Sequence, residues 1–177
     1  MDTGKLFLET TIKVFELYKK EAEAAIAQLD DKQLFTAPTS ESNSVAVIMK
    51  HLWGNMLSRW TDFLTTDGEK ESRDRDAEFE AADIKTKAEL MQKWEEGWAC
   101  MFKALNSLAT ADLDRKVFIR GEEYNVTRAI QRQLAHYSSH IGQIVYVAKM
   151  LKGKDWKTLS IPKGKSKEFN TKMFGKK

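Results

Sequence analysis

The chain has little cysteine and proline and no long hydrophobic stretch. Cys100 is the only cysteine among 177 residues, so no intrachain disulfide can form. Two prolines and nine glycines leave few interruptions, which favours long helices. The apolar runs are far shorter than the roughly 18 residues that span a bilayer, and the amphipathic, acid-containing N-terminus reads as neither a signal nor a transit peptide. These absences predict a cytoplasmic protein that does not enter a membrane.

Several familiar catalytic and metal-binding motifs are also missing. The sequence has no HExxH and no CxxC, which excludes the zincin arrangement and a zinc ribbon. It has no paired ExxH, which disfavours a di-iron carboxylate bundle. GxxxxGK[ST], GxGxxG and GxSxG are absent as well. No acidic residue lies at an obvious helical position beside a histidine, so the sequence identifies no catalytic acid or base.

The length of the chain predicts one domain, residues 1–177. Its net charge of +3 is spread unevenly. Residues 152–177 carry nine lysines and two acidic residues, so this basic tail has a charge of +7 and the rest of the chain −4. A solvated tail is the simplest interpretation. Nucleic-acid binding would favour interleaved arginine and aromatic residues, and there is no arginine after Arg132. Nucleic acid is therefore not an expected partner.

Four segments share an apolar recurrence close to 3.6 residues, which predicts helices: 3–29, 44–65, 86–109 and 126–152. Asn43 or Ser44 is a good N-cap for the second segment. Asn125 or Thr127 can cap the fourth, and Gly153 is placed to end it. The pattern predicts an all-α fold.

The polar connection 65–85 is too long for a tight turn. A crossover of this length lets the second and third helices run parallel. Long loops in compact domains are often functional, so Glu69, Arg73, Arg75 and Asp76 could cover a site. A solvated, charge-balanced loop is the alternative interpretation.

Two further segments flank the last predicted helix. Residues 115–126 alternate weakly around a central Arg-Gly pair, which predicts a short hairpin before that helix. After the helix, Trp156, Leu159 and Ile161 are apolar positions in an otherwise basic tail. We expect them to hold the tail partly against the helices, with only its last residues loose.

The three histidines are the candidates for chemistry. His136 and His140 are four residues apart on one predicted helix, so both imidazoles lie on the same face. Gln143 follows one turn later, and His51 lies on another helix. Three histidines from two helices would fill three positions of a divalent metal and leave the others open to water or substrate. Histidines that are only hydrogen-bonded in the core or at the surface are the alternative.

A polar stripe follows His51 along its helix. Asn55 and Arg59 come at four-residue steps after it, while the neighbouring faces are apolar. A polar stripe flanked by core positions indicates a pocket rather than plain packing. Asn55, Arg59 and Gln143 are therefore candidates for contacts to the metal ligands or to a substrate.

The residues around the histidines resemble the DinB/YfiT-like family of metal-dependent four-helix enzymes, and in particular an uncharacterised bacterial branch of it. His51 lies in IMKHLWGNM, and His136 and His140 lie in LAHYSSHIGQIVY. Further marks of the branch are RDRDAEF, RGEEYNV and LSIPKGKSKEFN. The resemblance implies an up-down-down-up four-helix bundle with a long crossover between the second and third helices. It also implies a divalent metal on these three histidines and frequent homodimers.

The implied metal is zinc or nickel, with iron or manganese as alternatives. Some relatives are transferases or isomerases that use a low-molecular-weight thiol, so the resemblance implies a thiol-dependent S-transferase-like activity on a small electrophile. Many members have a basic residue directly after the second histidine of the pair, whereas this chain has Ile141. A metal-dependent hydrolase and a non-catalytic, metal-binding stress-response protein are the alternatives.

Overall fold

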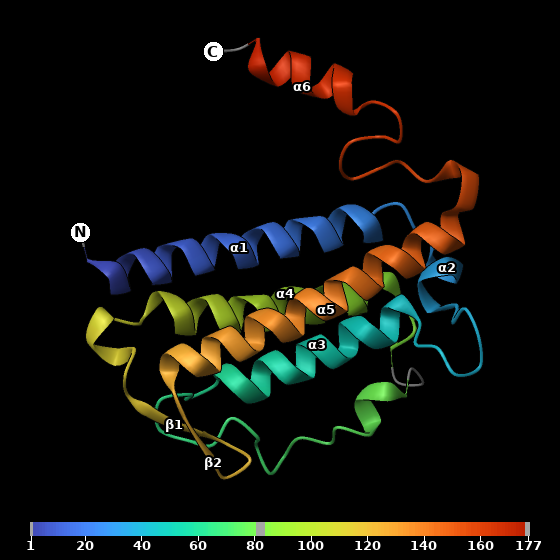
Figure 1. Ribbon diagram of the computed structural model, residues 1–177. Coiled ribbons are helices and arrows are strands. Elements are labelled where there is room, and N and C mark those ends of the chain that lie inside the picture. The colour runs from blue at the N-terminus through green and yellow to red at the C-terminus, as the bar shows by residue number, and fades with distance from the viewer. Residues whose placement is uncertain (1, 81–83, 176–177) are drawn as a thin grey trace.

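The computed structural model describes residues 2–80 and 84–175, which are mostly helical (Figure 1). The α-helices in this part of the chain are α1 (Thr3–Ile26), α2 (Asp31–Phe35), α3 (Val45–Trp60), α4 (Lys87–Asn106), α5 (Val126–Lys152) and α6 (Ser166–Phe174). Strands β1 (Lys116–Ile119) and β2 (Glu122–Asn125) form the predicted hairpin. The short 3-10 helices are η1 (Ala77–Phe79), η2 (Thr110–Asp112) and η3 (Gly153–Asp155). The predicted helical class is confirmed.

The four long helices lie side by side around one core. α3 contacts α4 and α5, and α1 also contacts both α4 and α5. In Figure 1, α1 and α5 run from left to right, whereas α3 and α4 run in the opposite direction. Buried aromatic rings meet at the centre, where Trp98 lies 5.5 Å from Trp94 and 6.1 Å from Tyr137 between ring centroids. None of the helices that the structure describes has the length and apolar character needed to cross a membrane.

Local capping fixes where two of these helices begin. The Ser44 side chain accepts a hydrogen bond from the backbone N–H of Val47, and Asn125 accepts one from Arg128. These are two of the predicted N-caps, and each satisfies a backbone donor that the first turn leaves free. At the other end of α5, Gly153 adopts φ 56°, a conformation that glycine reaches at low cost.

α1 ends at Ile26 and α4 at Asn106, each three residues before its predicted end, and the structure departs from the prediction in two further places. A short helix, α2, forms in a segment predicted as loop, because Asp30 and Gln33 make a reciprocal capping box there. The second long helix ends at Trp60 and not near residue 65, and Asp62 then adopts φ 48°. Phe63 keeps the helical spacing of apolar residues in the sequence, but it lies in the turn that follows α3 and is buried from there.

The hairpin is fastened to the start of the crossover. Arg120 and Gly121 take positive φ angles of 58° and 73° at its turn, as a two-residue type I′ turn requires. One Asp67 carboxylate oxygen accepts the Arg120 N–H and the other accepts the Gly121 N–H, both at 2.8 Å. Gly68 N–H donates to the Phe118 carbonyl at 2.7 Å. The hairpin therefore closes the end of the helices where the crossover begins.

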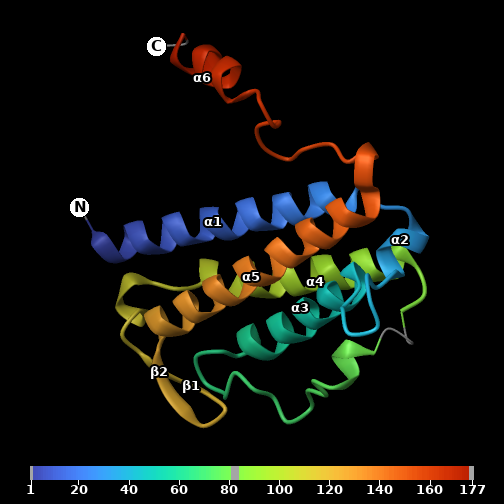
Figure 2. The same ribbon diagram turned by 45° about the vertical axis from the view of Figure 1, so that its right-hand side comes forward.

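The crossover between α3 and α4 lies against α3 along much of its length (Figure 2). Ser58 Oγ donates to the Gly68 carbonyl at 2.8 Å. Further along, Lys50 Nζ donates to the carbonyls of Ala77 and Glu80, both at 2.6 Å, and so holds η1. Residues 81–83 of the predicted connection lie outside the described residues.

The basic tail packs against the helices only near its start. Trp156 and Leu159 are half-buried against the core, whereas Ile161, the third predicted anchor, is 37% exposed. Residues 160–175 are all exposed, and α6 stands apart from the long helices in both views (Figures 1 and 2). Ile161 is not among the side chains that pack against the core in the described part of the chain, so it does not act as an anchor.

Candidate metal centre

The structure brings the three histidines together. His136 and His140 extend from one face of α5, and His51 extends towards them from α3, so one ligand atom of each lies within 4.8 Å of the others. The ring centroids are 4.6 Å apart for His136 and His140, 4.9 Å for His51 and His140, and 5.5 Å for His51 and His136. This is the only cluster of three or more potential ligands within residues 2–80 and 84–175.

Hydrogen bonds fix the tautomers of two rings. His51 Nδ1 lies 2.8 Å from a carboxylate oxygen of Glu78, and His140 Nδ1 lies 2.8 Å from the side-chain carbonyl oxygen of Gln143. Both oxygens can only accept, so each Nδ1 carries the proton and each Nε2 keeps its lone pair. Metal-binding histidines are usually oriented in this way. His51 and His140 are therefore prepared to bind a cation through Nε2.

His136 lacks such a partner. Its Nε2 is buried and has no hydrogen-bond partner among the described residues. Burial lowers the pKa of His136 to about 3, with smaller contributions from His140 and His51. The ring is neutral at physiological pH, and a buried, unsatisfied nitrogen is costly. A metal held by the three imidazoles would satisfy the site, so the donor set fits a divalent cation such as zinc.

Glu78 was not among the predicted site residues. It comes from η1 in the crossover, and Arg73 holds it through Nε at 2.7 Å and Nη2 at 2.8 Å. Burial alone would raise the pKa of Glu78, but the hydrogen bonds from Arg73 and His51 outweigh it and keep that pKa below its ordinary value. Glu78 is therefore ionised and fixed, which suits it to orient His51. No helical periodicity marks its segment, so the sequence offered no signal for it.

Gly54 leaves the space that Glu78 occupies. A Cβ atom at Gly54 would lie 2.3 Å from Oε1 and 2.8 Å from Cδ of Glu78. Gly54→Ala should therefore displace this carboxylate from His51 and weaken metal binding by about 10–100-fold, the usual effect of losing such a partner. Competition titration with a metal-binding dye measures the change. Gly142→Ala is the matched control. A Cβ atom there would meet no described atom within 4 Å apart from its own helix backbone and chain neighbours, so metal affinity should stay the same.

A cavity of about 190 Å³ opens beside the histidines. Its lining is histidine, arginine, one amide and one aromatic ring: His51, Asn55, Arg59, Arg73, Arg75, Phe79, Arg120, Arg132, His136 and His140. Residues from α3, the crossover, the hairpin turn and α5 meet here. The histidine cluster is thus connected to a space that a small molecule can enter.

The predicted polar contacts take different positions around this cavity. Asn55 lines it, but the Asn55 Oδ1 atom accepts hydrogen bonds from Gln133 at 2.7 Å and Tyr137 at 3.1 Å in the core. Arg59 lines it and donates to Glu69 at 2.8 Å and to the Gly68 carbonyl. Gln143 lies behind His140, as its hydrogen bond shows, and does not line the cavity.

Of the loop residues predicted to cover a site, Arg73 and Arg75 line the cavity. Glu69 does not line it but accepts a hydrogen bond from Arg59, which does. Asp76 is not in the lining.

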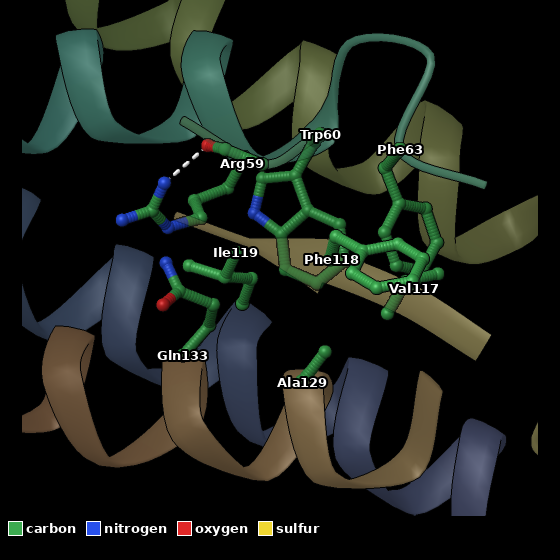
Figure 3. Close-up of a pocket in the computed structure, with 9 residues that line it drawn as sticks. Arg59, Trp60, Phe63, Val117, Phe118, Ile119, Ala129 and Gln133 are labelled. Atoms are coloured by element: carbon green, nitrogen blue, oxygen red, sulfur yellow. Dashed lines mark hydrogen bonds between the residues drawn. The ribbon is translucent and has the colours of Figure 1, made fainter. Parts of the chain in front are cut away.

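A second cavity borders Arg59 between α3, the hairpin and α5 (Figure 3). The guanidinium of Arg59 and the amide of Gln133 lie at one end, and apolar side chains surround the rest. Its volume of about 10 Å³ is room for one water molecule. It is too small for a substrate. The histidine cavity is the candidate site because it adjoins the three imidazoles.

Comparison with known proteins gives one match. Residues 2–165, nearly the whole chain and all three histidines, match a family model described as "Protein of unknown function (DUF1572)". No curated protein and no solved structure matches the chain significantly. The chain therefore belongs to the DUF1572 family, which is a DinB-like family.

Proposed function

We propose that this protein is a divalent-metal-dependent enzyme that joins a low-molecular-weight thiol to a small electrophile. The observation that carries the proposal is the convergence of His51, His136 and His140 beside a cavity. Two tautomers are fixed, and the buried Nε2 of His136 has no hydrogen-bond partner among the described residues. When bound, a divalent metal supplies Lewis acidity that lowers the pKa of a thiol or water and makes it nucleophilic at neutral pH. Zinc or nickel suits these ligands best, and iron or manganese is an alternative.

The residues around the cavity favour a thiol over water as the nucleophile. Among the described residues that line it there is no Asp, Glu or Cys. The nearest carboxylates, Glu69 and Glu78, are committed to Arg59, Arg73 and His51. Hydrolysis commonly uses a general base. A thiol, whose free pKa of roughly 8.5 is far below the roughly 15.7 of water, loses its proton to solvent more readily without one. The thiol sulfur then forms a bond to carbon, and the leaving group departs with its electron pair.

The remaining features of the proposal follow the family resemblance. We infer an up-down-down-up four-helix bundle built from α1, α3, α4 and α5, a homodimer, and a cytoplasmic location. The directions of the helices in Figure 1 support the bundle. A metal-dependent hydrolase with the same site is the second candidate, and a non-catalytic, metal-binding stress-response protein is the third.

A thiol-conjugation screen tests the proposed reaction. The metal-loaded protein is incubated with pairs of low-molecular-weight thiols and electrophiles, and products are identified by mass spectrometry. We expect a thioether whose formation needs the metal and disappears with chelator. Consumption of the electrophile without a thiol adduct would instead support the hydrolase. A chelator-sensitive melting temperature with no turnover of any pair would support the non-catalytic protein.

A further inference from the structure

Five arginines line the cavity beside the metal centre: Arg59, Arg73, Arg75, Arg120 and Arg132. They come from α3, the crossover, the hairpin turn and α5, so the fold gathers them from four separate places. A cavity with one sign of charge and low-dielectric walls concentrates the electric field and attracts the opposite charge.

Two carboxylates balance only part of this charge. Glu69 lies 2.8 Å from Arg59, 3.1 Å from Arg73 and 3.3 Å from Arg120. Glu78 pairs with Arg73. Within the described part of the chain, Arg75 and Arg132 have no carboxylate partner.

Neighbouring side chains keep these two arginines at the histidine end of the cavity. The Arg75 guanidinium lies 5.1 Å from the ring centroid of Phe79, which in turn stacks on His51 at 4.9 Å. Arg132 lies one helical turn before His136, and its Nη1 donates to Gln133 at 2.8 Å. Both guanidiniums are therefore placed beside the metal ligands, although they remain exposed to solvent.

Arg59 provides an independent observation. Its side chain is only 4% exposed, and its Nε is buried without a hydrogen-bond partner among the described residues. A buried cation with an unused donor is costly. Arg59 also lines the histidine cavity, so its buried positive charge adds to the charge that attracts an anion there.

We propose that the substrate bound beside the metal centre is a small anion, whose carboxylate or phosphate group is held by Arg75 and Arg132 with support from Arg59. That the bound anion is a substrate rests on the proposed function. That the cavity binds an anion rests only on the arginines. Planar guanidiniums match both kinds of oxyanion in geometry and charge. The cavity of about 190 Å³ is smaller than typical ligand pockets of roughly 300–1,000 Å³, so a small anionic group suits it.

Isothermal titration calorimetry at low ionic strength tests the anion site, with inorganic phosphate, acetate and neutral acetamide as probes. The full chain is used with and without chelator, since a bound metal also attracts anions. We expect saturable binding of phosphate or acetate, none of acetamide, and a Kd at least tenfold weaker in the Arg75→Gln/Arg132→Gln double variant under both conditions. Comparison of phosphate with acetate shows which oxyanion the site prefers.

Arg115→Gln/Arg128→Gln is the control, because it removes the same charge from two exposed arginines that do not line the cavity. Its Kd should stay within twofold of wild type. Equal weakening in both double variants, or no saturable anion binding in wild type, would overturn the anion site. This readout needs no turnover, so a failed thiol screen and a failed anion site give different results.

Discussion

Replacing His136 with alanine should reduce the bound metal from about one ion per chain to a small fraction of that. Removal of one of three imidazoles leaves two protein ligands, too few for a stable zinc site. The measurement is elemental analysis by mass spectrometry after tag removal and dialysis. Ser139→Ala is the control, because Ser139 is exposed on the same helix and should retain wild-type metal content.

The same variant has a second expected result without metal. In the presence of chelator, we expect the free energy of unfolding of His136→Ala to lie within about 1 kcal/mol of the wild-type value. The packing that is lost is offset by the removal of an unsatisfied buried nitrogen. With metal, only wild type should gain stability. Equal metal content in His136→Ala and Ser139→Ala would rule out the metal centre.

Glu78→Ala should have the largest effect on stability. It removes the bidentate partner of Arg73, whose side chain is 4% exposed, and loss of one partner of a buried ion pair costs about 3–5 kcal/mol. Because Glu69 still contacts Arg73, we expect about 3 kcal/mol, measured by urea unfolding in chelator. His51 also loses its orienting carboxylate, so metal affinity should fall by about 10–100-fold.

Two companion variants separate these effects. Glu78→Gln keeps an oxygen that can accept from His51, so its metal affinity should lie between those of wild type and Glu78→Ala. Glu80→Ala removes an exposed carboxylate two residues away and should change neither property. If Glu78→Ala bound metal as tightly as Glu80→Ala, Glu78 would have no orienting role.

The histidine cluster shows what helical spacing can and cannot predict. The four-residue separation of His136 and His140 places both rings on one face, because a helix repeats every 3.6 residues. The same rule placed Asn55 and Arg59 on the stripe that follows His51, and the structure puts both in the cavity lining.

Glu78 and its ion pair with Arg73 had no comparable signal in the sequence. They lie in a crossover without periodicity, where position depends on tertiary contacts such as those that Lys50 makes to the carbonyls of η1. The same holds for the end of α3, where the apolar spacing continued through Phe63 although the backbone left the helix after Trp60. Tertiary context overrides local pattern at such positions.

The shared carboxylate of Glu69 has a consequence for anyone who alters this protein. Because Arg59, Arg73 and Arg120 all contact it, the free-energy changes of substitutions at these four positions will not be additive. Once Glu69 is removed, Arg59, Arg73 and Arg120 are like charges without their shared partner, so a replacement of Arg120 should cost less stability in that background than in the native one. Any redesign of this cluster therefore has to alter the four side chains together and compare the results in double-mutant cycles.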